Sequence, residues 1–170
     1  MRSGPFVCLA LLAASCASAA PDRPAADDTA QFERLKSLAG AWTQTGETGA
    51  PKGAKVTYRI TAGGSTIEQL DFAGTAHEMV TLYTLDHGRL VLTHYCVLGN
   101  QPRMELQSVS GNTMVFDLTS LGNGDPSKDM HMHHAEITLV DNAHVKSGWT
   151  LWKDGRAGDT HGFALERTSN

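Results

Sequence analysis

The clearest two-faced segment of the chain is Val145-Lys146-Ser147-Gly148-Trp149-Thr150-Leu151-Trp152, close to the C-terminus. Val145, Trp149 and Leu151 share one face, whereas Lys146 and Thr150 lie on the other, because side chains in a β-strand alternate faces with period two. Residues 113–119 repeat the pattern, with Met, Phe and Leu opposite Asp117. These segments predict strands that hold one face against an apolar core and the other in water.

Similar runs recur at short spacing, separated by turn-forming pairs such as Gly63-Gly64, Gly111-Asn112 and Asp154-Gly155. Strands joined by such short turns are antiparallel neighbours. About ten strands in a chain of this size either form two sheets or close on themselves, and closure removes the exposed sheet edges. We therefore predict an all-β fold, an antiparallel up-and-down β-barrel. The predicted strands cover residues 41–48, 55–61, 66–72, 78–85, 89–98, 103–108, 113–119, 130–140, 145–152 and 160–167.

One short helix is predicted before the first strand, over residues 29–39. Phe32, Leu35 and Leu38 recur there at a helical spacing. Thr29 is expected to cap the helix start and Gly40 to end the helix.

The N-terminal region predicts export. Residues 1–20 combine Arg2, a short apolar stretch and small residues, as in a signal peptide, and the apolar stretch is too short to span a bilayer. Two processing routes are open: Cys16 as the lipidated first residue of a bacterial lipoprotein, or ordinary cleavage after Ala17-Ser18-Ala19. We favour lipidation, because a cysteine has no other use directly after the apolar stretch. Residues 21–28 are predicted to form a flexible tether, and residues 29–170 one domain.

Composition excludes several classes of protein. The chain has 14 basic and 18 acidic residues and a formal net charge of −4, so a basic patch for nucleic acid is not expected. Cys8 is removed with the signal, and Cys16 is either removed with it or lipidated, so Cys96 is the cysteine left to the folded body, which excludes a disulfide framework. The sequence also lacks a Gly-x-Ser-x-Gly elbow, a phosphate loop and a dinucleotide fingerprint.

Histidines mark the predicted polar part of the interior. Glu136 and Thr138 indicate the solvent face of their strand, which predicts that His131 and His133 face the barrel interior. By the same alternation, His94 and Cys96 share the inward face of Leu90 and Leu92. Apolar interiors rarely hold so many titratable groups unless these bind something or satisfy one another.

Two interpretations of these histidines stay open. Neutral imidazole is a common metal ligand, so His94, His131 and His133, with His161 as a further member, are candidates for zinc, copper or haem iron. Alternatively, the histidines hydrogen-bond to protein groups or water and line a polar cavity. Trp149 is the predicted cavity wall, and Arg103 either contacts the ligand or pairs with an acidic residue such as Asp71 or Glu105.

A short helix that leads into Gly40-Ala41-Trp42, followed by a strand meander that ends at Arg167, resembles the calycin superfamily, which includes lipocalins and fatty-acid-binding proteins. The resemblance implies that Trp42 closes the barrel bottom and that Arg167 packs across it, with hydrogen bonds to nearby carbonyls. Segments such as 93–96, 99–104 and 131–134 look like an uncharacterised group of secreted bacterial lipocalin-like proteins. The chain departs from fatty-acid-binding proteins, because Arg167 is not part of an Arg-x-Tyr clamp.

The sequence therefore predicts an exported, periplasmic or membrane-anchored protein that binds a small, largely hydrophobic molecule in its barrel. His94, Cys96, Arg103, His131 and His133 are expected to contact the ligand, together with Trp149 and His161. A metal- or haem-dependent enzyme that uses interior histidines is one alternative. An envelope protein that binds partners through the barrel exterior is another. The only membrane contact expected is the lipid at Cys16, and the sequence leaves the ligand, the cofactor and the oligomeric state open.

Overall fold

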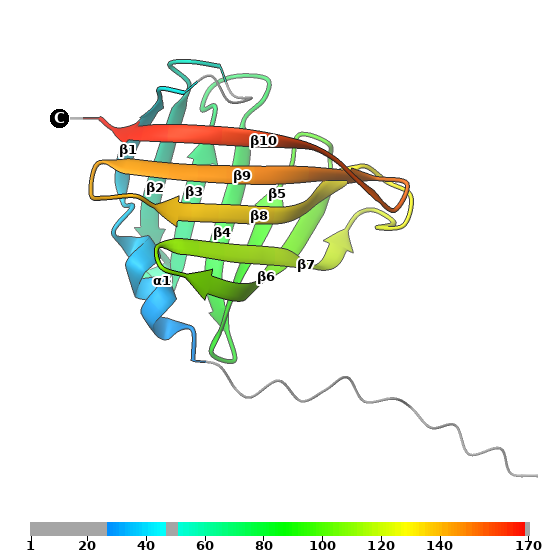
Figure 1. Cartoon of the computed structure of the whole chain (residues 1–170), viewed down its shortest axis with the longest axis horizontal. Helices are drawn as coiled ribbons and strands as arrows, with labels where there is room; N and C mark the ends of the chain where they lie inside the picture. The colour runs from blue at the N-terminus through cyan, green and yellow to red at the C-terminus, as the bar shows by residue number, and fades with distance from the viewer. Residues whose placement is uncertain (1–26, 47–50, 169–170) are drawn as a thin grey trace, which may run out of the picture.

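The chain forms one closed antiparallel β-barrel, in which each strand pairs with its sequence neighbours and the first pairs with the last (Figure 1). The computed structural model describes residues 27–46 and 51–168, and the segments proposed for export and lipidation lie outside these ranges. The predicted all-β barrel is confirmed. Its elements are α1 (Thr29–Lys36), β1 (Gly40–Gln44), β2 (Lys55–Thr61), η1 (Ala62–Gly64), β3 (Thr66–Asp71), β4 (Met79–Asp86), β5 (Arg89–Tyr95), β6 (Gln101–Ser110), β7 (Thr113–Gly122), β8 (His131–Leu139), β9 (His144–Lys153) and β10 (Arg156–Arg167).

The start of the folded body differs from the sequence prediction. Asp28, assigned above to the tether, is buried: its backbone N–H donates to the Gly88 carbonyl at 2.9 Å and its carboxylate accepts from the Leu90 N–H at 2.9 Å. The prediction that Thr29 caps α1 is wrong, because Asp28 holds the N-cap position and makes no side-chain cap bond. The helix also ends at Lys36, before Gly40. The folded body therefore includes Asp28, one residue before the predicted start of the domain.

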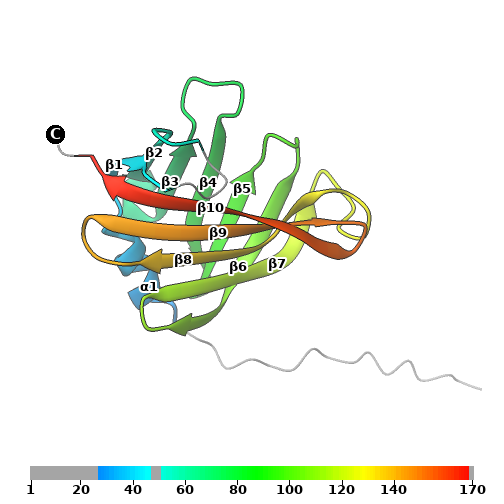
Figure 2. The ribbon, with the colours of Figure 1, turned by 45° about the horizontal axis from the view of Figure 1, so that its top comes forward.

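The two ends of the barrel differ because the meander places alternate turns at opposite ends. Helix α1 lies at the end that holds the β4–β5, β6–β7 and β8–β9 turns (Figures 1 and 2). Arg34 of α1 donates to Gly111 and Asn112 of the β6–β7 turn, and Asp28 bonds to the β4–β5 turn. We call this the closed end. The β3–β4, β5–β6 and β7–β8 loops lie at the other, open end.

Trp42 and Arg167 seal the closed end. The guanidinium carbon of Arg167 lies 4.2 Å from the Trp42 ring centroid, in a cation–π contact. Arg167 also donates to the carbonyls of Ser37, Ala39 and Asn142 at 2.7–2.9 Å. The Trp42 indole is fully buried and donates to the Leu38 carbonyl at 2.7 Å. The contact that the calycin resemblance implied is thus present, and it ties the end of α1 to the first and last strands.

The apolar core fills the half of the barrel next to this seal. Its largest buried side chains come from alternate positions of facing strands, as the two-residue period requires. They include Tyr83, Leu92, Met104, Phe116 and Ile137. The core is therefore solid at one end, which leaves the open end to hold any cavity.

Within residues 27–46 and 51–168, no helix is long and apolar enough to cross a bilayer.

Candidate functional site

A cavity of about 840 Å³ occupies the open half of the barrel. Its wall combines inward side chains of the strands with the loops of the open end. Most lining residues are apolar, among them Phe72, Met79, Met132, Leu151 and Phe163. The loop residues Val97, Leu98 and Met130 line the same cavity and are substantially exposed, so its entrance is apolar too. A space of this size with apolar walls is typical of a small-molecule site.

His94 lies deep in the cavity, where it meets Trp149. Both side chains line the cavity, and their ring centroids lie 5.1 Å apart although the residues come from β5 and β9, on different sides of the barrel. His94 Nδ1 is 2.8 Å from Thr81 Oγ1 of the neighbouring strand. Burial lowers the pKa of His94 to about 4, so the imidazole is neutral at pH 7. Its Nε2 is buried and has no hydrogen-bond partner among the described residues.

A second polar group of the interior is centred on Asp71. The Asp71 side chain is 3 % exposed and belongs to a residue of the cavity lining. Gln69 Nε2 donates to its two carboxylate oxygens at 2.9 and 3.1 Å, and the Tyr83 hydroxyl donates to Gln69 Oε1 at 2.6 Å. Burial raises the pKa of Asp71 to about 6, although the Gln69 hydrogen bonds act in the opposite direction. The cavity therefore contains an acceptor group that its surroundings leave short of donors.

The positions predicted for His131 and His133 are wrong, and a β-bulge is the reason. The β8–β9 register shifts between Met132 and His134, which leaves His133 as an extra residue. Before the bulge, Met132 pairs with Leu151 and both line the cavity, so the adjacent His131 points away from it. His131 is nevertheless buried. Its Nδ1 lies 2.7 Å from the Asp129 carbonyl of the β7–β8 loop.

His133 completes a cluster on the outer side of the sheet. Its Nδ1 lies 3.0 Å from His131 Nε2, and its ring centroid lies 3.7 Å from that of Trp152. Burial lowers the pKa of His133, and the neighbouring His131 acts in the same direction. These two histidines satisfy each other instead of converging on His94. Within the described part of the chain, no group of three or more His, Cys, Asp or Glu residues could hold a metal ion, so the proposed ligand set is not assembled.

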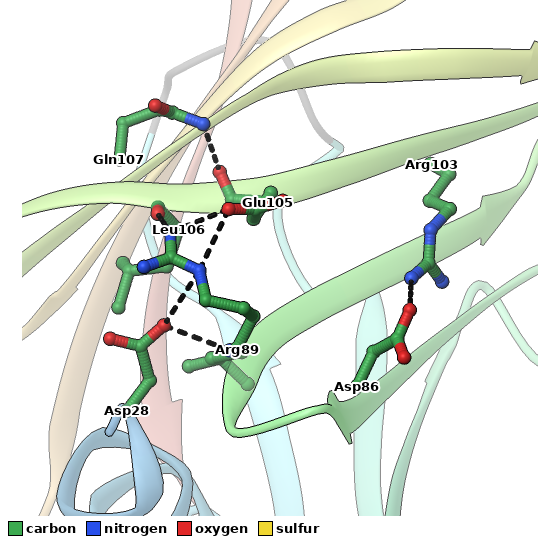
Figure 3. A network of polar contacts seen from close by, with 8 residues as sticks. Asp28, Asp86, Arg89, Arg103, Glu105, Leu106 and Gln107 are labelled. Carbon is green, nitrogen blue, oxygen red and sulfur yellow. Dashed lines mark hydrogen bonds and ion pairs between the residues drawn. The ribbon is translucent and has the colours of Figure 1, made fainter. Parts of the chain in front are cut away.

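Arg103 also lies outside the cavity. Figure 3 shows that it pairs with Asp86 of β4, not with Glu105. It does not pair with Asp71 either, and it is absent from the cavity lining. The same view shows that Glu105 forms an ion pair with Arg89, whose Nε donates to Glu105 Oε1 at 2.8 Å. Arg89 also donates to the Leu106 carbonyl at 3.0 Å and approaches the Asp28 carboxylate at 3.8 Å. This network fixes the start of α1 against β5 and β6. The structure does not place Arg103 at the cavity, so its expected contact with a ligand has no support from the cavity lining.

Four of the predicted site residues do line the cavity: His94, Cys96, Trp149 and His161. Cys96 is a half-buried free thiol whose pKa is raised by burial, and His161 is exposed on β10. Sequence reasoning missed Asp71 and Gln69. Their signal was present, because Ile67, Gln69 and Asp71 alternate within β3 and an apolar residue at the first position indicates that all three face inward.

Comparison with known proteins adds no family: no protein-family model matches the chain, and no curated protein matches it either.

Proposed function

We propose that the chain is an exported, lipocalin-like protein that binds a small, largely hydrophobic molecule in the open half of its barrel. The observation that carries the proposal is the cavity of about 840 Å³, in which the buried His94 Nε2 finds no partner in the described part of the chain. An apolar wall provides affinity through burial of ligand surface, and a few polar atoms provide orientation. Leaving a polar atom buried and unpaired costs about 1–3 kcal/mol, so a ligand that bonds to Nε2 recovers that free energy.

The test is a titration with the neutral fluorescent probe N-phenyl-1-naphthylamine. Of the three tryptophans, only Trp149 lines the cavity, so we expect saturable binding that quenches tryptophan emission by energy transfer, and a weaker quench in Trp149→Phe. Met132→Trp adds a bulky side chain to the cavity wall and is expected to weaken binding at least about tenfold, since it replaces ligand volume. Val109→Trp, at an exposed position, is the matched control. The proposal is contradicted if the probe shows no saturable binding to the original chain. It is also contradicted if Met132→Trp and Val109→Trp bind the probe equally.

Export and lipidation are part of the same proposal. Residues 1–20 have the composition of a signal peptide, and Cys16 follows its apolar stretch. The mass of the mature N-terminus tests this directly: a diacylated or triacylated Cys16 is expected. An unmodified start after Ala19 supports export without lipid, and an intact Met1 in the mature protein contradicts export.

A further inference from the structure

We infer that the preferred ligand of this cavity is an amphiphile with an apolar body and a protonated amine, and that Asp71 is the countercharge of that amine. The inference rests on the proposed function, because it names the ligand class of the same cavity. It depends on the position of Asp71, on the groups that already bond to it, and on the surroundings of His94.

Asp71 is an acceptor with spare capacity. A carboxylate offers about four lone-pair sites, and the Gln69 amide, with two N–H groups, fills at most two of them. Among residues 27–46 and 51–168, no ion pair includes Asp71. A buried carboxylate without a cation is costly, and a cation that reaches it forms a charge-assisted hydrogen bond. The free protein therefore lacks the partner that Asp71 requires.

The Gln69 amide that bonds to Asp71 is itself held in place by Tyr83. The Tyr83 hydroxyl donates to Gln69 Oε1 at 2.6 Å, and this bond fixes the Gln69 amide with its NH₂ group toward Asp71. Tyr83 and Gln69 are both almost fully buried, so the arrangement is held by the solid half of the core. Gln69 can supply neutral N–H groups but no positive charge. The remaining oxygen lone pairs are therefore available to a ligand donor in the cavity.

His94 favours the same kind of ligand. The direction of the bond between His94 Nδ1 and Thr81 Oγ1 depends on the imidazole tautomer. In the tautomer with the proton on Nδ1, His94 donates to Thr81 and the unpaired Nε2 is a second acceptor on a residue of the cavity lining. Near these two acceptors the wall is aromatic: Trp149 packs on His94, and Phe72 packs on Phe163 at a centroid distance of 5.8 Å. Aromatic faces attract cations as well as apolar groups.

The basic residues of the lining argue less strongly for an anionic ligand. Lys55, His77 and His161 belong to the lining, but all three are exposed, and the Lys55 amine donates to Thr43 Oγ1 at 2.8 Å. Charges in contact with water interact weakly with a ligand, because water and salt screen them. Asp71 is buried, so its charge acts in a medium of lower dielectric constant. The balance of charge that a bound ligand meets is therefore negative.

Three molecules with the same alkyl chain test the inference: octylamine, octanol and octanoate, each used at pH 7.5 to displace N-phenyl-1-naphthylamine. Octylamine is cationic at this pH, octanol neutral and octanoate anionic. We expect octylamine to bind about tenfold to a hundredfold more tightly than octanol, as one charge-assisted hydrogen bond allows. Asp71→Asn keeps the side-chain shape and is expected to reduce the amine preference to less than about threefold. Asp117→Asn, on the outer face beside His134, is the matched control and is expected to retain it.

The outcomes separate this inference from the proposed function. If octanol or octanoate binds as tightly as octylamine, or if Asp71→Asn keeps the full preference, the amine inference is overturned and the binding function stands. If neither the probe nor any of the three ligands binds, the proposed function itself fails. The ratio between octylamine and octanol is measured on the unmodified chain, so it decides the question even if Asp71→Asn does not fold.

Discussion

Buried polar atoms are hydrogen-bonded differently at the Trp42–Arg167 seal of the closed end and around the cavity of the open half. At the closed end, the Trp42 indole and the Arg167 guanidinium donate to four backbone carbonyls at 2.7–2.9 Å. In the open half, counting partners among residues 27–46 and 51–168, His94 Nε2 has none and Asp71 has only the neutral Gln69 amide. Satisfied polar groups stabilise a fold, whereas unsatisfied ones beside a cavity are retained at a cost in stability. Arg89 Nη1, beside the start of α1, is also buried without a partner among the described residues, so the contrast holds between the Trp42–Arg167 seal and the cavity groups. It indicates that the seal serves the fold and the cavity serves binding.

The largest effect is expected from Trp42→Ala at the closed end. Removal of a fully buried tryptophan lowers the free energy of unfolding by about 3–5 kcal/mol through lost transfer energy and a new cavity. It also leaves Arg167 without its ring contact. Urea unfolding followed by circular dichroism measures the loss, and probe affinity at low temperature should stay within about threefold of the original. Trp152→Ala, at a half-buried position on the outer side, is the control and should cost clearly less. A strong loss of probe affinity in folded Trp42→Ala would mean that the two halves are not separate.

Gly40→Ala is expected to destabilise the same end by about 1–3 kcal/mol. Gly40 has a φ of +133°, and a Cβ there would lie 2.9 Å from Arg167 Nη1. The substitution therefore strains the backbone and displaces the guanidinium. Thermal unfolding measures the change. The control is Gly53→Ala, which also has a positive φ but meets no atom within 4 Å, so the difference between the two variants reports the contact with Arg167.

In the open half, Asp71→Asn is expected to stabilise the protein at neutral pH. Burial raises the Asp71 pKa from 3.8 to about 6, so between these values the native state binds a proton that the unfolded state has released. The contribution of Asp71 to stability therefore falls as pH rises through this window. The free energy of unfolding of Asp71→Asn should exceed that of the original chain by a difference that grows from near zero at pH 4 to about 1–3 kcal/mol at pH 7. Urea unfolding across this range measures it, and a gain that is independent of pH contradicts the account.

His94 is expected to affect the pH dependence of the free energy of unfolding in the opposite direction to Asp71, and His94→Gln tests this. Burial lowers the His94 pKa from 6.5 to about 4, so in this window the unfolded chain binds a proton that the native state does not. The contribution of His94 is full above pH 6.5 and is lost as pH falls toward 4. The original chain should therefore lose stability relative to His94→Gln on acidification. Because the Asp71 and His94 slopes oppose each other between about pH 4 and 6, the two variants must be measured separately.

The smallest effect is expected from Arg103→Ala. Arg103 pairs with Asp86 outside the cavity, and both side chains are partly exposed. Such pairs contribute about 0–1 kcal/mol. Thermal unfolding should show a correspondingly small shift, and the affinity for N-phenyl-1-naphthylamine should not change. A marked loss of probe affinity would mean that Arg103 contributes to ligand binding, which contradicts this prediction.

The strands were predictable because ten strand-like segments are separated by turn residues, and the structure confirms each of them to within a few residues at its ends, except that residues 47 and 48 of the first segment lie outside the described ranges. His94 and Trp149 were placed correctly, since the β4–β5 register is regular through His94 and the β9–β10 register is regular between His144 and Trp149. His131 and His133 were not, because one extra residue in β8 reverses the direction of every side chain before it. Such a bulge has no sequence signal here, as the segments on both of its sides alternate normally. The partner of Arg103 depended on the strand register, which the sequence left open.

The methionine methyl groups offer the most direct test, because they are distributed between the two halves. Met79, Met130 and Met132 line the cavity, whereas Met104 and Met114 are fully buried in the core. We predict that octylamine, titrated into protein with ¹³C-methyl methionine, shifts the first three methyl resonances in NMR spectra and leaves the other two unchanged. If all five resonances stay in place, or if Met104 and Met114 shift as much as the cavity methionines, the division into a solid half and a binding half is contradicted.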